Sequence, residues 1–563
     1  MSTLGEALRF LRSRGFKRVA SQDSSTRTFE GPLRVSRGVV PARLEIHDWD
    51  FIAYPGIFLL ERPPFLPAPM ANIDASGGLC YLTPGSVVLD RFDPAGSLAL
   101  CLHQAEILLD RLIGNPSHRK TAMQDEFLAY WAGGAGPRRW ALIGDLDPAT
   151  PTARYSVIAL PKDRLQGADL IVISSSRSEV EHLAQAVQGK IVLQDGALCW
   201  ILTSSVNPVA PEGSLPSSIK ELFGYLKLWD KEVYRKIQDI LGRDRRYLKA
   251  STASFAIKSP AGWVGFSFDT NAVAQRTFGR KPSIYRHYLH TKGGETLIAR
   301  MAISEFGAEF LHTRNLEVSS LSGRRVLLVG CGAVGAYVAQ ALARLGAGSK
   351  GGELKLVDPE PLEPGNVGRH WLGMSSLFLP KAHAVASELS RQFPESRFLP
   401  AHADIRQLPN IFQSDLIVDA TGIEAISELL NALHCQGQRH DRVPVLYVWV
   451  LGNGAAVQSL WVDSPKYGCY RCLRLPKGAQ YRQDRYPILN EAPVFRTAGC
   501  SQYRPYAVSA PMNAAALATE IVVDWLGGDV SPRFRSVLRE GANVRRQKNL
   551  DPDRLNGCPA CSK

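Results

Sequence analysis

Long apolar runs are missing from this sequence of 563 residues. No stretch of 18 consecutive apolar residues occurs, and the first residues, MSTLGEALRFLRSRGF, have the spacing of an amphipathic helix without the apolar core of a secretion signal. These absences argue against a membrane-spanning helix and against secretion. We therefore expect a soluble, cytoplasmic protein with no membrane partner.

Cysteine is scarce, and the basic residues are scattered. Only ten cysteines occur, four of them in two Cys-x-x-Cys pairs, which fits metal and thiolate chemistry in a reducing compartment better than a disulfide framework. The net charge is +13, but the densest basic cluster, Arg243-Asp244-Arg245-Arg246, is short. The pattern argues against nucleic-acid binding and leaves open the attraction of an acidic protein partner.

The remaining composition is that of a globular protein, with 45% hydrophobic and 21% charged residues, and the length allows three or four domains. We predict an α/β and α+β multidomain protein with segments 1–132, 133–310 and 311–563. The run Gly133-Gly134-Ala135-Gly136-Pro137 indicates a hinge at the first boundary.

The clearest chemical signal lies in the third segment. Residues Arg325–Val329 predict a buried strand that leads through a tight turn into a helix. Three glycines make that turn: Gly330, Gly332 and Gly335. Glycines let the backbone approach a phosphate, and the free N–H groups of a helix start point at it. A second strand, Glu353–Val357, ends at Asp358, the spacing at which a carboxylate reaches a ribose hydroxyl. NAD and ATP both fit this pattern.

The polar residues that follow favour ATP. Asn366, Arg369 and Lys381 come within one further helix length of Asp358. Hydride transfer needs few cations, whereas attack on a triphosphate requires its charge to be neutralised. We predict that Arg369 and Lys381 neutralise the phosphates, that Asn366 orients them, and that Asp358 holds the ribose.

These motifs, in this order, resemble the ThiF-type adenylating domain of ubiquitin-activating and sulfur-carrier-activating enzymes. The likeness continues through Asp419-Ala420-Thr421 and covers about residues 311–563. It implies a Rossmann-like fold, ATP and Mg²⁺ as cofactors, and an acyl adenylate plus pyrophosphate as products. Family members commonly have a second acidic residue where this chain has Gly422, so ligation falls to Asp419 or Asp404. Alternatively, Asp419 caps the turn after its strand.

For two further residues, Arg314 and Cys500, the sequence leaves two roles open. Arg314 is a candidate for an extra cation at the triphosphate, or else a surface arginine. Cys500 precedes a helix expected at Asn513–Leu526. In related activating enzymes a cysteine between the two zinc half-sites takes the acyl group from the adenylate, so the resemblance implies Cys500 as the first thiol. Arg496 and Arg504 favour its thiolate. A structural loop cysteine is the alternative.

The two Cys-x-x-Cys pairs form the strongest isolated signal. Four thiolates suit tetrahedral zinc, and because no position is left open the site should be structural. The predicted ligands are Cys469, Cys472, Cys558 and Cys561. Four unrelated thiols are the alternative. Because the pairs lie far apart in the sequence, Zn²⁺ would hold the C-terminal tail against the domain, and chelation should loosen it.

The first segment carries a second motif. Strands are expected at Ala42–Ile46 and Gly56–Leu60, and helices at Leu98–Leu112 and Asp125–Trp131. With Asn72 eight residues before Cys80, this layout resembles the ubiquitin-conjugating fold, although Met70-Ala71 stand where that family usually has His-Pro.

The chemistry of this motif is acyl transfer. A surface cysteine can carry a thioester, while a side-chain amide donates to the developing oxyanion. We predict Cys80 as acyl acceptor and Asn72 as oxyanion donor. The alternative is a buried, inert Cys80.

No chemical motif stands out between the two domains. We predict one helix over Ser218–Leu241, a β-hairpin formed by Ser254–Ile257 and Trp263–Phe268, and a helix over Glu295–Phe310 that leads into the adenylating fold. This segment is expected to be a linker domain.

The order of the domains resembles the bacterial fused activating and conjugating enzymes of anti-phage CBASS operons. The resemblance implies that the acyl donor is the C-terminus of a cGAS-like cyclic-nucleotide synthase, which becomes joined to an amine of a target protein. The adenylating family is usually dimeric, so the resemblance to that family implies a homodimer. Two alternatives remain: a donor that is a ubiquitin-like protein, and a sulfur-carrier adenylyltransferase whose N-terminal part only docks a partner. A third, less favoured, is a nucleotide-gated scaffold.

Overall fold

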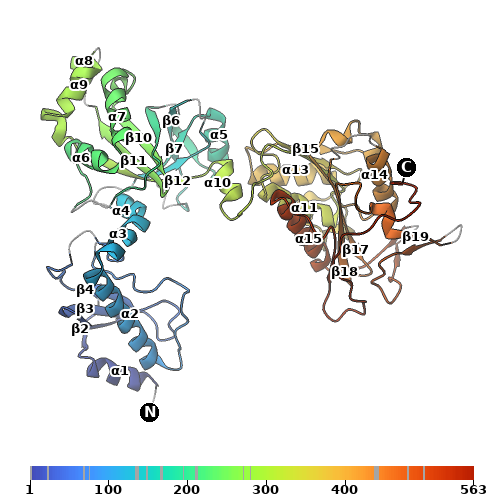
Figure 1. The fold of residues 1–563 in the computed structure, drawn as a ribbon, viewed down its shortest axis with the longest axis horizontal. Helices are drawn as coiled ribbons and strands as arrows, with labels where there is room; N and C mark the ends of the chain where they lie inside the picture. The colour runs from blue at the N-terminus through green and yellow to red at the C-terminus, as the bar shows by residue number, and fades with distance from the viewer. Residues whose placement is uncertain are drawn as a thin grey trace. The chain divides into compact units, whose positions relative to one another are not determined.

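The computed structural model of the chain divides into two compact units (Figure 1). The first comprises Met1–Leu142, Asp147–Tyr155 and Asp195–Ser304, and the second comprises Ile143–Leu146, Ser156–Gln194 and Glu305–Lys563. The structure describes residues 3–21, 25–66, 70–74, 76–133, 139–146, 150–164, 169–194, 196–209, 214–270, 272–278, 281–436, 443–477, 481–498 and 501–562.

An antiparallel sheet with the order β1-β2-β3-β4 opens the first unit. Its elements are α1 (Thr3–Ser13), β1 (Lys17–Val19), β2 (Arg27–Val35), β3 (Gly38–Ile46), β4 (Gly56–Leu59) and α2 (Pro94–Gly114). Leucines of β2, β3 and α2, among them Leu33, Leu44 and Leu102, form one buried core. The predicted strands at 42–46 and 56–60 and the helix at 98–112 are confirmed within these longer elements.

Local signals set the ends of α2. Asp93 accepts a hydrogen bond from the N–H of Gly96 at 2.9 Å, and Pro94 occupies the first helical turn, where its missing N–H costs nothing. The helix ends at Asn115 because Pro116 cannot continue it. A new helix, α3 (Pro116–Asp125), begins there and is followed by α4 (Phe127–Gly133). The predicted final helix corresponds to α4, whereas α3 was missed.

The rest of the first unit contains strands β9 (Leu198–Thr203), β10 (Thr252–Ser259), β11 (Gly262–Asp269) and β12 (Ile298–Glu305), which lie side by side in the order β12-β11-β10-β9. The predicted hairpin is confirmed by the antiparallel pairing of β10 with β11. The remaining elements are β5 (Arg139–Ile143), β6 (Thr152–Ala159), α6 (Ile219–Trp229), α7 (Lys231–Arg243), α8 (Ala272–Phe278) and α9 (Pro282–Leu289).

Two predicted helices are wrong here. The helix over Ser218–Leu241 is broken at Asp230, whose carboxylate accepts the N–H groups of Glu232 and Val233 and so begins a new helix. Most of the segment Glu295–Phe310 instead forms strand β12. Its backbone groups pair with those of β11, which would lack hydrogen-bond partners on that side if the segment were a helix.

The second unit is built on a seven-stranded sheet with the order β15-β14-β13-β16-β17-β18-β23. The five strands from β15 to β17 are parallel, β18 pairs antiparallel with β17, and β23 pairs antiparallel with β18. The strands are β13 (Arg325–Val329), β14 (Glu353–Val357), β15 (Phe398–Ala401), β16 (Leu416–Asp419), β17 (Val445–Leu451), β18 (Ala456–Val462) and β23 (Phe534–Leu538). The helices are α10 (Ala308–Thr313), α11 (Ala333–Arg344), α12 (Pro364–Val367), α13 (Lys381–Gln392), α14 (Glu424–Gln436) and α15 (Ser509–Leu526). Smaller elements are β7 (Asp169–Ser174), α5 (Arg177–Ala186), β8 (Lys190–Leu193), β19 (Arg474–Lys477), β20 (Tyr481–Asp484), β21 (Arg496–Ala498) and β22 (Ser501–Tyr503).

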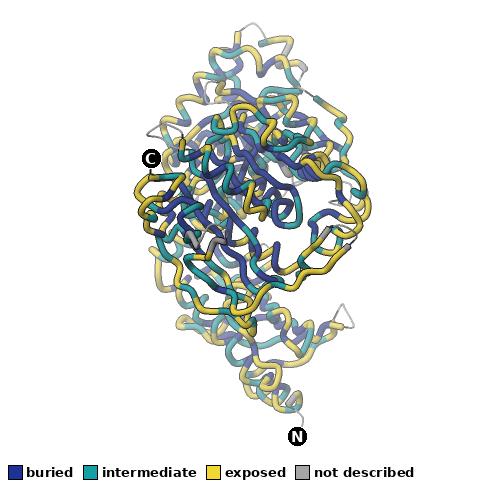
Figure 2. The backbone as a smooth tube through the Cα atoms, turned by 90° about the vertical axis from the view of Figure 1, so that its right-hand side faces the viewer, coloured by how far each residue is buried: buried dark blue, intermediate teal, exposed yellow. Residues whose placement is uncertain are grey.

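Strand β13 is buried on both faces. Val326 and Leu328 point into a core covered by α11, α13 and α15, whereas Leu327 and Val329 point into a second core that includes Leu430 of α14. Figure 2 shows dark blue buried stretches alternating with yellow exposed ones along the backbone. This is the layered α/β arrangement expected for a Rossmann-like domain. Among the described residues no helix is long and apolar enough to cross a membrane.

The glycine turn after β13 gives a first prediction. A Cβ on Gly335 would lie 1.8 Å from the carbonyl oxygen of Gly330, whereas a Cβ on Gly332 would have no atom within 4 Å. We expect Gly335→Ala to lower the free energy of unfolding by about 2 kcal/mol or more, and the matched Gly332→Ala to change it by less than about 0.5 kcal/mol. Urea denaturation followed by tryptophan fluorescence measures both. Equal stability of the two variants would contradict this packing.

Candidate functional site: a nucleotide cavity, a cysteine cluster and an exposed thiol

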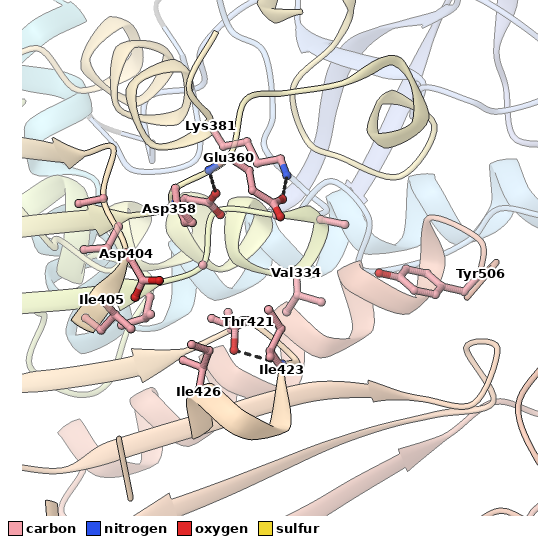
Figure 3. Close-up of a pocket in the computed structure, with 18 residues that line it drawn as sticks. Val334, Asp358, Glu360, Lys381, Asp404, Ile405, Thr421, Ile423, Ile426 and Tyr506 are labelled. Atoms are coloured by element: carbon pink, nitrogen blue, oxygen red, sulfur yellow. Dashed lines mark hydrogen bonds and ion pairs between the residues drawn. The ribbon is translucent and has the colours of Figure 1, made fainter. Parts of the chain in front are cut away.

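The glycine turn shapes a cavity at the carboxyl ends of the parallel strands. β13 lies between β14 and β16, so the chain leaves β13 toward one side of the sheet and later returns on the other; ligands of open α/β sheets bind at such a point. The cavity has a volume of about 180 Å³ (Figure 3). Its polar and glycine lining includes Gly330, Gly332, Asp358, Glu360, Lys381, Asp404, Thr421 and Tyr506.

Gly330 and Gly335 are needed for this shape for different reasons. Gly330 has a φ of +88°, and a Cβ there would lie 3.0 Å from the backbone of Thr421. Gly335 lets α11 approach the carbonyl of Gly330. The predicted role of these glycines thus has a geometric basis. His370 was missed by the sequence analysis, and it supports the same turn because its Nε2 lies 2.8 Å from the carbonyl oxygen of Cys331.

Asp358 is a buried carboxylate that joins two segments of the cavity wall. It accepts the N–H of Cys331 at 2.7 Å and the N–H of Glu360 at 2.8 Å. Burial raises its pKa, while these two hydrogen bonds and the nearby charge of Lys381 oppose the rise. The carboxylate lines the cavity, as a ribose ligand must.

Lys381 is the cation at this wall. It begins α13, its side chain is 6% exposed, and its Nζ lies 2.6 Å from the Glu360 carboxylate. Figure 3 shows Lys381, Glu360 and Asp358 together on one side of the cavity. A buried cation is screened less by water, so it can neutralise phosphate charge more strongly than an exposed lysine could.

Asn366 and Arg369 do not line the cavity. The side chain of Asn366 accepts the N–H of Glu363 at 3.0 Å and helps to cap the short helix α12. The guanidinium of Arg369 lies over the ring of Tyr506, 4.7 Å from its centre. Tyr506 itself lines the cavity. The predicted contacts of Asn366 and Arg369 with phosphate therefore stay predictions.

The acidic candidates for Mg²⁺ differ in environment. Asp419 is fully enclosed and accepts hydrogen bonds from Thr421 and, at 2.5 Å, from the hydroxyl of Ser427. Burial raises its pKa. Asp404 lines the cavity, and hydrogen bonds from Arg406 lower its pKa to about 2, so it is ionised at neutral pH. The guanidinium of Arg314 lies over Phe310, and Arg314 is not among the residues that line the cavity.

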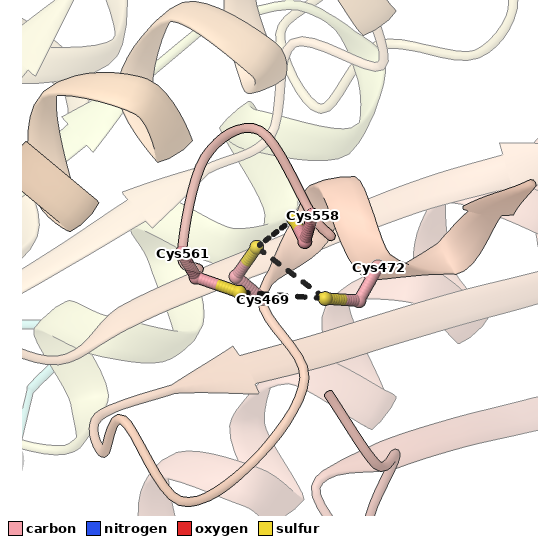
Figure 4. A group of neighbouring side chains, drawn as sticks. All are labelled: Cys469, Cys472, Cys558 and Cys561. Carbon is pink, nitrogen blue, oxygen red and sulfur yellow. Dashed lines mark hydrogen bonds between the residues drawn. The ribbon is translucent and has the colours of Figure 1, made fainter. Parts of the chain in front are cut away.

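The four cysteines of the two pairs meet in one place (Figure 4). Sulfur separations are 3.8 Å for Cys469–Cys472, 3.8 Å for Cys469–Cys558 and 3.5 Å for Cys472–Cys561. Zn–S bonds of about 2.3 Å in a tetrahedron place sulfurs about 3.8 Å apart, so the cluster could hold zinc.

Hydrogen-bond donors surround this cluster as well. The side-chain amide of Asn431 donates to the sulfur of Cys469 at 3.5 Å, and the N–H of Leu555 donates to the sulfur of Cys472 at 3.3 Å. Such donors stabilise thiolates that bind a metal. The donor set and its surroundings both fit a closed structural site.

Cys500 lies outside the described residues. The strands on either side of it, β21 and β22, pair antiparallel with Ala498 opposite Ser501. The role of Cys500 as first thiol stays a prediction, and so do the effects of Arg496 and Arg504 on it.

Cys80 and Asn72 are brought together in the first unit. The N–H of Cys80 donates to the carbonyl of Asn72 at 2.9 Å, and Cys80 is exposed. Asp74 shapes the turn between them by accepting the N–H groups of Ser76 at 2.7 Å and Gly78 at 2.8 Å. An exposed thiol does not fit the alternative of a buried structural cysteine.

Glu126 and Tyr130 complete this site and were not expected from the sequence. Glu126, between α3 and α4, accepts the backbone N–H of Asn72 at 2.9 Å and also its side-chain amide. Asn72 has a φ of +61°, so these two bonds hold a backbone conformation that is unfavourable for most residues. The hydroxyl of Tyr130 donates to the carbonyl of Ile73 at 2.7 Å. Only a helix was expected here, with no chemical role.

Charge and burial set the reactivity of Cys80. Partial burial raises the pKa of the Cys80 thiol, and the negative charges of Glu126 and Asp74 raise it further. Burial and the charge of Glu126 likewise raise the pKa of Tyr130 to about 12.

Comparisons with known proteins agree with this geometry. Residues 12–135 match the prokaryotic E2 family B, and residues 300–548 match the ThiF family. The ATP-dependent ubiquitin transferase-like protein Cap2 of Pseudomonas aeruginosa is 28% identical over 100% of this chain and 99% of its own length. The protein of the same name from Vibrio cholerae is 24% identical over 93% of this chain and 92% of its own length.

The chain is thus similar along its whole length to the Cap2 protein of Pseudomonas aeruginosa, and it carries an activating-type and a conjugating-type domain on one chain. It is an activating and conjugating enzyme with a Rossmann-like ThiF domain and an N-terminal E2-like domain. The match to a crystal structure of E. coli MccB with ATP covers 43% of this chain and 67% of the MccB chain, with 17% identity. Its TM-score of 0.33 is too low to support a conclusion.

The charge around the Cys80 thiol gives a second prediction. Because the negative charge of Glu126 disfavours the thiolate, Glu126→Gln should lower the pKa of Cys80 and move the midpoint of its alkylation to lower pH. Each drop of one in that pKa raises the thiolate fraction at pH 8 about tenfold, as long as the pKa stays above 8. Iodoacetamide labelling of Cys80 across a pH series, read by peptide mass spectrometry, measures the midpoint.

The matched control is Asp125→Asn, which removes a charge from the exposed neighbouring residue and should leave the midpoint in place. An unchanged midpoint in Glu126→Gln would show that the carboxylate does not act on the thiol.

Proposed function

We propose that the chain adenylates the C-terminus of a protein, carries it as a thioester first on Cys500 and then on Cys80, and joins it to an amine. The observation that carries the proposal is the exposed Cys80 beside Asn72 on the same chain as a nucleotide cavity lined by Asp358 and Lys381. A sulfur-carrier enzyme has no need of that thiol. In this proposal residues 1–132 conjugate, residues 133–310 link, and residues 311–563 activate.

In the first step a carboxylate oxygen of the donor attacks the α-phosphorus of ATP, and pyrophosphate leaves. Lys381 and Arg369 neutralise the phosphates, Asn366 helps to orient them, and Asp358 holds the ribose. The ionised carboxylate of Asp404 at the cavity could hold Mg²⁺, and Mg²⁺ would add charge neutralisation at the phosphates. Asp419 acts indirectly, because the hydrogen bonds that it accepts fix Thr421 in the cavity wall.

In the second step the thiolate of Cys500 attacks the acyl carbon and AMP leaves. The thiol of Cys80 then displaces Cys500, so the thioester passes to the conjugating site. Asn72 donates a hydrogen bond to the oxyanion in this transfer and in the last step, in which the target amine attacks, the C–S bond breaks and an amide forms.

The four cysteines of the cluster are assigned to Zn²⁺ with a structural role. The ion would hold the segment around Cys558 against the segment around Cys469, which lies next to α14. It contributes no chemistry to acyl transfer in this scheme.

For the acyl donor we favour the C-terminus of a cGAS-like cyclic-nucleotide synthase, with a target protein as acceptor, in anti-phage defence. The likeness to the fused CBASS enzymes supports this choice. A homodimer is expected because the adenylating family is usually dimeric.

The relay gives a third prediction. The chain is incubated with ATP and a cGAS-like synthase as candidate donor, and products are separated without reductant. Wild type should form reductant-sensitive adducts and amide product. Cys80→Ala should keep the adduct on Cys500 and lose amide product at least about a hundredfold, because the second acceptor is gone. Cys500→Ala should lose both.

Cys101→Ala is the control, because Cys101 is fully buried in α2 and takes no part in the relay. Full product formation by Cys80→Ala would support the alternative of an adenylyltransferase with an N-terminal docking domain.

A further inference from the structure

Tyr506 lies at the nucleotide cavity, and the adenylation scheme gives it no role. It comes from the segment that joins β22 to α15, far in sequence from the glycine turn. Figure 3 shows its ring at the opposite side of the cavity from Asp404, with its hydroxyl directed toward Val334.

A cationic side chain lies against the ring of Tyr506. The guanidinium of Arg369 lies 4.7 Å from the centre of the Tyr506 ring. No carboxylate is within ion-pair distance of Arg369 among the residues that the structure describes. Within the described part of the chain, an aromatic ring and not a carboxylate faces this guanidinium, so it stays available to an anion.

The backbone beside Tyr506 is fixed by a single side chain. Asn453, in the turn between β17 and β18, donates to the carbonyl of Pro505 at 3.0 Å. It also accepts the N–H of Val494 at 2.8 Å and donates to the carbonyl of Val494 at 2.9 Å. The next residue of the turn, Gly454, has a φ of +76°, and a Cβ there would lie 3.3 Å from the Cβ of Tyr506. The backbone next to the Tyr506 ring is thus held by the hydrogen bond from Asn453 and lies close to Gly454.

We propose that Tyr506 is a positioning residue, whose ring holds the Arg369 guanidinium at the edge of the cavity so that it can reach the polyphosphate of ATP. The inference rests on the proposed adenylation and adds to it the means by which an arginine outside the cavity lining acts on the nucleotide. Asn453 contributes by holding Pro505, the residue before Tyr506.

The proposal is tested with ATP and adenosine as probes, since Arg369 should act on phosphate and not on the nucleoside. Isothermal titration calorimetry of the full chain with Mg²⁺ gives both affinities. Tyr506→Leu keeps apolar packing but removes the aromatic face, and should weaken ATP binding about tenfold while leaving adenosine binding unchanged. Tyr506→Phe keeps the aromatic face and should bind ATP like wild type.

A double-variant comparison separates positioning from an independent contact. Arg369→Ala should weaken ATP binding at least as much as Tyr506→Leu, and the combination should be no weaker than Arg369→Ala alone, because residues that act through one another are not additive. Tyr503→Leu, in β22 of the same segment and exposed, is the matched control and should bind ATP like wild type.

Three results would overturn the proposal: ATP binding by Tyr506→Leu that equals wild type, losses that multiply in the double variant, or an equal loss for adenosine. A wild-type chain that binds neither probe would contradict the proposed adenylation itself. A lower thermal midpoint of Tyr506→Leu does not affect the test, since Tyr506→Phe and Arg369→Ala still report on the ring face and on the cation.

Discussion

The buried carboxylate of Asp358 is the interaction on which the nucleotide cavity depends. Through one oxygen it holds the N–H of Cys331 in the glycine turn, and through the other it holds the N–H of Glu360, whose own carboxylate pairs with Lys381. One desolvated group therefore fixes the backbone of the glycine turn relative to Lys381. A buried carboxylate without these partners would be costly, so the arrangement is held as a unit.

Placing an activating and a conjugating centre on one chain changes the physics of the transfer between them. Between separate proteins the transfer depends on collision, whereas on one chain the effective concentration of the second thiol is set by the segment that joins the domains. In the proposed relay, the environment of Cys80 suits a thiol that holds its acyl group. Its raised pKa makes it a poorer leaving group, and a thioester on it resists water longer than one on an acidic thiol would.

Sequence patterns predicted well those parts of the molecule in which local chemistry and tertiary structure agree. The strand before Gly330, the helix that begins at Pro94 and the Cys-x-x-Cys pairs are such cases, because turn glycines, caps and metal-ligand spacings are local features. The thiol of Cys80 beside Asn72 was also foreseen, through the resemblance to a known fold.

The failures have a common cause in contacts between distant parts of the chain. Residues 298–305 have good helix formers but form β12, because the edge of β11 needs a partner. Glu126 and Tyr506 gave no signal, since one acts on Asn72 from 54 residues away and the other lies beside Arg369 only once the sheet has formed. Asp419 and Arg369 were expected at the nucleotide for their charge; neither is among the residues that line the cavity, and their roles there stay predictions.

The central claim is that an acyl group reaches the N-terminal domain, and a trapped intermediate tests it most directly. Replacing Cys80 with lysine, expressing the Cys80→Lys chain with its neighbouring genes and measuring the intact mass should reveal an ATP-dependent adduct that survives reductant, because the acyl group is then held as an amide. The added mass would identify the donor. No such adduct, with a reductant-sensitive adduct still formed on Cys500, would contradict the account and leave the N-terminal domain as a docking module.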